Sequence, residues 1–168
     1  MSSRSYRLPA ALKAKGEQAE ADFRDWLNLS GVAFLYVEQS PLTVPQTLRG
    51  RIKRPDYLVG IPHAGSLAFD VKAKSLYDGQ FLFDREEVQK LATFARLFNL
   101  AVYFACIDGE DGQRHWWVPL SELLHRPEER RGKRLVVTFP TAAALEVNHG
   151  RESFLDAVFN MNARALSL

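Results

Sequence analysis

The sequence has 168 residues, of which 46% are hydrophobic and 25% are charged, and its net charge is +2. This length fits one compact domain, and the composition excludes a wholly disordered chain. No apolar run approaches the roughly 18 residues needed to span a bilayer, and residues 1–12 lack the apolar core of a signal peptide. The single cysteine, Cys106, excludes an internal disulfide and a cysteine-rich zinc site. We therefore expect a soluble, cytoplasmic protein with no membrane partner.

A helix and two strands are predicted before residue 62. Residues 12–29 predict a helix that ends at Gly31, and residues 32–37 predict a strand. A long loop at 39–55 separates them from the short apolar strand Tyr57–Ile61, and loops of this length are usually functional or disordered. The apolar face of the helix combines residues at helical spacing: Ala19, Phe23, Trp26 and Leu27.

Residues 66–74 predict the clearest strand, because polar and apolar residues alternate along it. One face carries Leu67, Phe69 and Val71, which should point toward the core. Asp70 and Lys72 then lie side by side on the opposite face. An Asp-x-Lys triplet is common by chance, so its neighbours decide whether it matters.

A second helix is predicted at 84–99, after a turn at Asp78-Gly79. Asp84 is placed as its N-cap, and Glu87, three residues later, completes a capping-box-like pattern. Ala101–Ile107 predicts the next strand. The apolar face of this helix should contain Val88, Leu91, Ala92, Ala95 and Phe98.

The C-terminal part predicts strands at 115–118 and 135–139, a short helix at 121–125 and a helix at 153–165. On the last helix, the residues expected to point inward are Phe154, Leu155, Val158 and Phe159. The order of elements predicts an α/β fold, a mixed sheet with helices on both sides.

Asp56 and Asp70 are expected to lie close together. Asp56 opens the strand Tyr57–Ile61, and a turn at 62–65 would fold this strand back against residues 66–74 as a hairpin. Neighbouring carboxylates repel each other unless a cation or proton intervenes, and oxygen ligands suit Mg²⁺ or Mn²⁺. Lys72 could then orient water or stabilise charge on a phosphate. The alternative for Asp56 is an ordinary turn after a proline.

A third carboxylate is offered by the first helix. With Ala19 at 0°, Glu20 falls at about 100° and Glu17 at about 160°. Glu17 should therefore face solvent, whereas Glu20 lies at the border of the buried face and could look toward the other carboxylates. Glu20 is the better candidate, and the alternative is an ordinary glutamate on the side of a helix.

Basic residues gather in two places, although the net charge is too small to demand a nucleic-acid partner. The loop before Asp56 holds Arg49, Arg51, Lys53 and Arg54, and residues 128–134 hold a second, mixed cluster. Each by itself is more simply a solvated, charged loop. The first cluster leads directly into Asp56, so it could contact phosphates that flank a cleavage site.

Other candidates are weaker. His63, His115, His125 and His149 show no zinc-ligand spacing, and each is expected on the surface or in a loop. Cys106 is expected to be a small core residue. Trp116 and Trp117 should alternate between faces, which leaves one of them the option of stacking on a base, although packing is the simpler role.

The motifs, taken together, resemble the PD-(D/E)XK nuclease superfamily, and in particular its archaeal Holliday-junction-resolvase-like branch. The segments that carry the resemblance are Lys15-Gly16 with Ala19-Glu20, Arg54-Pro55-Asp56, the segment 69–75, and the helix and strand that follow it. They cover about residues 13–107. The middle acid is Asp70, where glutamate is commoner, and the region from about Pro119 onward has no counterpart, so 1–168 is expected to be one nuclease-like domain with an unassigned C-terminal extension.

The resemblance implies a restriction-endonuclease-like fold and assigns the site. Glu20, Asp56 and Asp70, with the backbone carbonyl of Val71, would bind Mg²⁺ or Mn²⁺, and Lys72 would be the catalytic lysine. The DNA-binding residues would be Arg49, Arg51, Lys53, Arg54 and Lys74, and Ser75 and Gln89 fall at accessory polar positions. The expected function is a metal-dependent DNA endonuclease, with branched or repair DNA as one option and a homodimer as another. The alternatives are a DNA-binding or assembly module without catalysis, and a coincidence of motifs.

Overall fold

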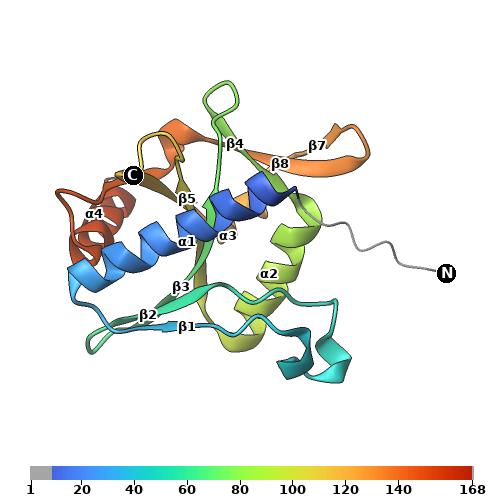
Figure 1. The fold of residues 1–168 in the computed structure, drawn as a ribbon, viewed down its shortest axis with the longest axis horizontal. Coiled ribbons are helices and arrows are strands. Elements are labelled where there is room, and N and C mark those ends of the chain that lie inside the picture. The colour runs from blue at the N-terminus through green and yellow to red at the C-terminus, as the bar shows by residue number, and fades with distance from the viewer. Residues whose placement is uncertain (1–8, 168) are drawn as a thin grey trace.

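Two β-sheets and four α-helices form the protein in a computed structural model, which describes residues 9–167 (Figure 1). The larger sheet has six strands in the order β1-β2-β3-β5-β6-β9, and the smaller has three in the order β4-β8-β7. Within the described residues, no helix is long and apolar enough to cross a membrane. The helices are α1 (Ala10–Ser30), α2 (Arg85–Phe98), α3 (Leu120–Leu123) and α4 (Phe154–Leu166). The strands are β1 (Phe34–Tyr36), β2 (Tyr57–Ile61), β3 (Gly65–Ala73), β4 (Gln80–Asp84), β5 (Ala101–Ile107), β6 (Arg114–Pro119), β7 (Glu128–Arg131), β8 (Arg134–Pro140) and β9 (Leu145–Asn148).

The larger sheet is mixed. Strands β3 and β5 run parallel, and its other neighbouring strands are antiparallel. A parallel pair needs a crossover, and α2 supplies it. Helices α1 and α4 pack on one face of the sheet, whereas α2, α3 and the smaller sheet pack on the other. Figure 1 shows α1 lying across the front of the large sheet. The predicted α/β fold with helices on both sides is confirmed.

The alternation along β3 separates the two cores. Leu67, Phe69 and Val71 pack beneath α1 as predicted, while Ala68 packs on the α2 side. Asp70 lies on that second face, because side chains of a strand alternate. This face was expected to be polar, but α2 and β4 cover it. Asp70 is consequently fully buried.

Helix α2 begins and ends as its sequence predicts. The Asp84 side chain accepts hydrogen bonds from the backbone N–H groups of Glu86 and Glu87, at 2.9 and 3.3 Å. Asn99 ends the helix in the left-handed conformation, with φ 51°. Only half of the predicted capping box forms, because the Glu87 side chain points to two lysines instead of the start of the helix.

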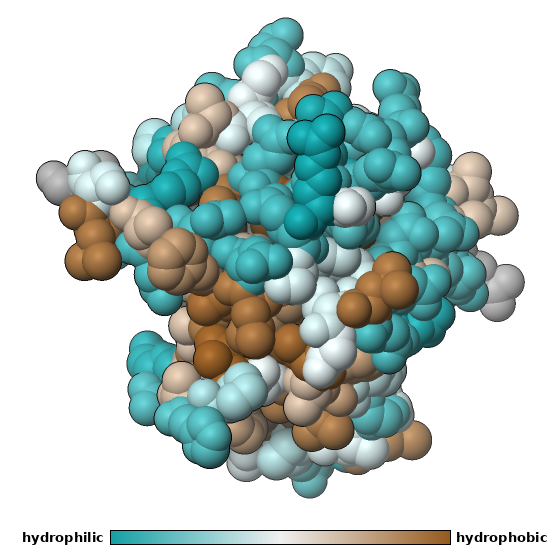
Figure 2. All heavy atoms as spheres, turned by 90° about the vertical axis from the view of Figure 1, so that its left-hand side faces the viewer, coloured by the Kyte–Doolittle hydropathy of each residue, from teal (hydrophilic) through white to brown (hydrophobic). Residues whose placement is uncertain are grey.

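The C-terminal region is built into both sheets. Strands β4, β7 and β9 were not predicted: β7 is exposed throughout, and β9 is a short edge strand with a single buried residue, Val147. Helix α4 buries Phe154, Ala157 and Val158, which share a face at helical spacing. The predicted inward positions of Leu155 and Phe159 are wrong, since these residues are 44% and 72% exposed. Figure 2 shows that this end of the molecule carries an apolar area surrounded by hydrophilic side chains.

The burial of the tryptophan, histidine and cysteine side chains of β5 and β6 tests the predictions made for them. Trp116 and Trp117 do alternate between faces, but both are buried, one in each core. His115 lies in β6 and is fully buried, so its expected surface or loop position is wrong. Its Nε2 accepts a hydrogen bond from the Trp117 indole at 2.7 Å, and its Nδ1 contacts Nε2 of His149. Cys106 is a buried core residue, as predicted.

Candidate active site

Asp70 lies in β3, a central strand of the large sheet, and Asp56 immediately precedes the neighbouring strand β2. The β2–β3 hairpin pairs Tyr57 with Phe69, and the Asp56 N–H donates to the Phe69 carbonyl at 2.9 Å. The Asp56 carboxylate accepts a hydrogen bond from the Val71 N–H at 2.7 Å. Both acids are buried, with 8% and 0% of their surface exposed. The predicted hairpin therefore brings these two carboxylates together.

A cluster of alternating charges surrounds Asp70. Lys72 Nζ lies 3.1 Å from one carboxylate oxygen of Asp70, and Lys53 Nζ lies 2.7 and 2.8 Å from the two oxygens. Glu87 Oε1 accepts from both lysines, at 2.5 Å from Lys53 Nζ. The cluster thus pairs two acids with two lysines, and its members come from β3, α2 and the loop before β2.

Glu87 is the residue that sequence reasoning missed. Its position three residues after Asp84 satisfied a capping pattern, and that pattern gave no reason to consider a second role. No local pattern marked that second role, because β4, the strand that leads directly into α2, was itself not predicted. The Lys53 backbone N–H also donates to the Lys90 carbonyl at 3.2 Å, which ties the loop to α2. A cavity of about 430 Å³ opens beside Lys53 and Glu87.

Burial and neighbouring charge shift the proton affinities of the acids. Burial, followed by repulsion from Asp70, raises the pKa of Asp56 to about 7, although the hydrogen bond from Val71 acts in the opposite direction. Burial and then Asp70 also raise the pKa of Glu20. Carboxylates that disfavour each other's charge are typical of a site that accepts a cation.

Glu87 and Lys72, in contrast, both stay ionised. Burial favours neutral Glu87, but Lys72 and Lys53 outweigh it and hold the pKa of Glu87 at about 2. Burial likewise favours a neutral amine at Lys72, yet Asp70 and Glu87 more than offset it, so the pKa of Lys72 is raised. Lys72 is therefore an ammonium group, which can stabilise negative charge but cannot take up a proton.

Glu20 lies on α1, the helix that packs on the face of the sheet opposite to the one that carries Asp70. It is half-buried, and its pKa responds to Asp70, Lys72 and Lys53, which places it within electrostatic reach of all three. Glu17 is 69% exposed at its side chain and pairs with Lys13 at 3.8 Å. Among the described residues, no hydrogen bond or ion pair joins the Glu20 side chain to the cluster.

The basic residues predicted to bind DNA lie in different environments. Arg49 and Arg51 are exposed, with the Arg49 Nε donating to the Val44 carbonyl at 3.2 Å. Arg54 turns back into its own loop, where it donates to Thr43 and Ser40 at 2.7 Å each. Lys53 points into the acid cluster. Of the four, Arg49 and Arg51 are thus the two best placed to meet an incoming phosphate.

Lys74, Ser75 and Gln89 lie outside the cluster. Lys74 donates to the Leu82 carbonyl and lies 4.8 Å from the centre of the Phe83 ring, so its ammonium faces the protein. Burial lowers the pKa of Lys74. Ser75 and Gln89 are exposed, and neither side chain bonds to the acids or lysines of the site within residues 9–167. The accessory roles of Ser75 and Gln89 stay predictions.

The side chains of the site are of the chemical type that binds a divalent cation. Asp56, Asp70 and Glu20 offer the hard oxygen ligands that Mg²⁺ and Mn²⁺ prefer, and burial followed by repulsion from Asp70 raises the pKa of Asp56. In the part of the chain that the structure describes, however, no three acidic, histidine or cysteine side chains are arranged as a ready metal-binding group. Lys53 lies on the Asp70 oxygens that a cation would need. A cation would therefore have to replace the Lys53 ammonium there.

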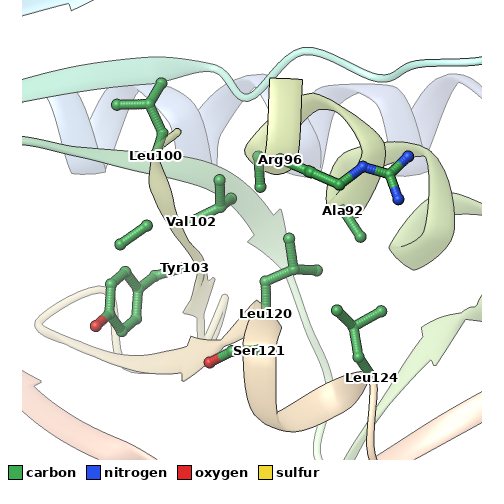
Figure 3. Close-up of a pocket in the computed structure, with 10 residues that line it drawn as sticks. Ala92, Arg96, Leu100, Val102, Tyr103, Leu120, Ser121 and Leu124 are labelled. Carbon is green, nitrogen blue, oxygen red and sulfur yellow. The ribbon is translucent and has the colours of Figure 1, made fainter. Parts of the chain in front are cut away.

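A separate apolar cavity of about 320 Å³ lies at the other end of α2. Figure 3 shows its lining, in which Leu100 and Tyr103 of the β5 region face Leu120 and Leu124 of the α3 region, with Arg96 at the edge. It contains no acidic side chain among its lining residues. Its chemistry does not suit phosphate hydrolysis, and the acid cluster remains the candidate site.

No family model matches the sequence, and no curated protein matches it significantly. Solved structures are more informative. The fold is similar to that of Hjc, a Holliday junction resolvase from Archaeoglobus fulgidus, with a TM-score of 0.53 and 25% identity over 79% of this chain and 92% of that one. D212, a nuclease from a fusselovirus, is also similar, with a TM-score of 0.46 and 12% identity over 83% and 89% of the two chains. The resemblance predicted from the motifs is confirmed, and the chain has the mixed-sheet fold of an archaeal resolvase-like PD-(D/E)XK nuclease.

Proposed function

We propose that this protein is a metal-dependent DNA endonuclease that hydrolyses phosphodiester bonds. The observation that carries the proposal is the buried Asp70 beside Lys72, with Asp56 at the start of the neighbouring strand and Glu20 within electrostatic reach. The fold similarity to a DNA junction resolvase supports the same class of reaction. Branched or recombination DNA is accordingly the first substrate to test.

The residues of the site have separate roles in the proposed hydrolysis. Glu20, Asp56, Asp70 and the Val71 carbonyl would hold Mg²⁺ or Mn²⁺, which when bound activates water and offsets charge on the phosphate. Lys72, kept as an ammonium by Asp70 and Glu87, stabilises the negative charge that builds up in the transition state. Glu87 orients Lys72. Arg49 and Arg51 would contact phosphates beside the cut, which positions DNA without specifying its sequence.

The test is cleavage of supercoiled, branched and single-stranded DNA in Mg²⁺ or Mn²⁺, by wild type and by Lys72→Ala. We expect metal-dependent cleavage by wild type and a loss of roughly 100-fold or more in the variant, as for removal of one transition-state donor. Lys13→Ala removes an exposed lysine that pairs with Glu17, and it should cleave normally. Equal cleavage by wild type and Lys72→Ala would remove Lys72 from the mechanism.

A second candidate is a DNA-binding module that does not cleave. The contact of Lys53 with both Asp70 oxygens favours it, because the cluster is already neutral without a metal. Tight DNA binding together with no cleavage of any substrate would select this function. Two sites are needed to cut two strands symmetrically, so a homodimer belongs to the nuclease proposal, and light scattering of the purified protein tests it.

A further inference from the structure

The hairpin formed by β7 and β8 ends in an exposed basic tip. We define the basic tip as Arg130, Arg131, Lys133 and Arg134, each of which is exposed. Its turn is tight, and Gly132 adopts φ 62°, a value that suits glycine in a two-residue hairpin turn. These residues lie in the C-terminal region for which the sequence suggested no role.

The tip gathers like charges at a cost in stability. Arg131 and Arg134 are direct partners in the antiparallel register, and like charges at opposed positions destabilise a hairpin. Lys133 lies between them in the turn. An arrangement of this kind is easier to understand if an anion binds there than if it serves folding alone.

The acids of the hairpin neutralise only one residue of the tip, Arg131. Glu128 pairs with Arg85 of α2 at 2.6 Å, outside the hairpin, and Glu129 pairs with Arg131 at 3.3 Å. Within residues 9–167, Arg130, Lys133 and Arg134 form no ion pair. The tip therefore presents positive charge to solvent, where arginine side chains suit the bidentate recognition of phosphate.

The hairpin is fixed in position relative to the candidate active site. Val136 of β8 pairs with Asp84 of β4, and Asp84 is the N-cap of α2, the helix that supplies Glu87. The ion pair between Arg85 and Glu128 joins the same helix to β7. Figure 1 shows the hairpin and the loop 39–55 projecting on the same side of the molecule, with α2 between them.

We propose that the basic tip binds the phosphate backbone of duplex DNA that extends from the active site, on the side of α2 opposite Arg49 and Arg51. The inference rests on the proposed function and adds a second contact surface to it. Such contacts are independent of sequence, since they reach only phosphates. The competing explanation is that the charges keep the edge strand β7 from pairing with other chains.

The test compares DNA affinity over a range of salt concentrations for wild type, the tip variant R130Q/K133Q/R134Q and the control K13Q/R96Q/R151Q. The control removes the same charge from exposed sites outside the hairpin. With a fluorescent 30-bp duplex, we expect the tip variant to bind roughly tenfold or more weakly at low salt. The slope of log affinity against log salt should become less steep by about 0.9 for each phosphate that the tip no longer neutralises. Thermal unfolding should show that both variants remain folded.

The outcomes separate this inference from the nuclease proposal. If the tip variant binds DNA with the affinity and salt dependence of wild type, the basic tip does not bind DNA. If that variant also aggregates in the same experiment, the charges instead protect the edge strand β7. Weaker binding by the tip variant alone supports the inference, even if wild type cleaves no DNA. Wild type that binds no DNA at any salt concentration overturns both proposals.

Discussion

The Lys53 ammonium donates to both carboxylate oxygens of Asp70, at 2.7 and 2.8 Å. Asp70 is fully buried, whereas the Lys53 side chain is 27% exposed and lies on a loop. A buried carboxylate is stable only when it is paired, and Lys53 and Lys72 are its two ion-pair partners among residues 9–167. Asp70 is also the acid that a catalytic metal would need. Lys53 and a divalent cation should therefore compete for the same oxygens.

Replacing Lys53 with methionine should strengthen metal binding. Charge-assisted hydrogen bonds contribute roughly 1.5–3 kcal/mol, and a cation would no longer have to replace them. We expect the affinity for Mn²⁺, measured by calorimetry without DNA, to rise about tenfold, which corresponds to about 1.4 kcal/mol. Lys13→Met serves as the control. An affinity that is unchanged or weaker would show that Lys53 does not compete with metal.

Replacing Glu87 with glutamine should impair catalysis without impairing DNA binding. The variant keeps the shape of the side chain but removes the negative charge that holds Lys72 and Lys53. We expect kcat to fall roughly tenfold or more, with KM for DNA nearly unchanged, because the loss lies in the transition state. Glu86→Gln, on the exposed side of the same turn, is the matched control. A raised KM with normal kcat would contradict a role in positioning Lys72.

His115 should make the protein less stable in mild acid. Burial, followed by repulsion from His149, lowers the pKa of His115 well below 6.5 in the folded state. In the unfolded chain the His115 imidazole therefore binds a proton near pH 6.5, whereas in the folded chain it stays neutral at that pH. The stabilisation is complete above that pH and declines below it, by up to about 1.4 kcal/mol per pH unit.

Urea unfolding at pH 8, 7, 6 and 5 measures this effect by comparing wild type with His115→Gln. Glutamine can still accept the hydrogen bond from Trp117 but does not titrate. Asp56 contributes with the opposite sign, because its pKa is raised, so the difference between the two proteins is the relevant quantity. Parallel pH profiles in the two proteins would contradict the assignment to His115.

Phe154 should be essential for the stability of the whole domain. Its ring is fully buried against Trp26, Phe69 and Trp117, so α4 shares a core with α1 and β3. Phe154→Ala should cost about 3–5 kcal/mol in urea unfolding, as other large-to-small core changes do. Phe159→Ala changes an exposed side chain on the same helix and should cost about 0.5 kcal/mol or less. Similar values for the two variants would show that α4 is an appendage.

Local patterns were sufficient for the chain's strongest predictions. Alternation along residues 66–74 predicts that Asp70 and Lys72 share a face, because successive side chains of a strand point to opposite sides. The turn at 62–65 predicts the hairpin that brings Asp56 beside Asp70. In the same way, helical spacing predicts the buried face of α1. Each of these relationships is determined by backbone geometry within a few residues.

The tertiary structure alone decided the surroundings of Asp70. Lys53 reaches it across 17 residues of sequence, and Glu87 meets Lys53 across 34. Glu87 satisfied a local capping pattern, and Lys53 resembled one more residue of a solvated basic loop. A buried carboxylate pairs with the cations that the fold brings close to it. For Asp70, the packing of α2 and of the loop against β3 determines which cations these are. The sequence by itself determined which side chains share a strand face; only the folded chain decided which charges meet in the buried space beside it.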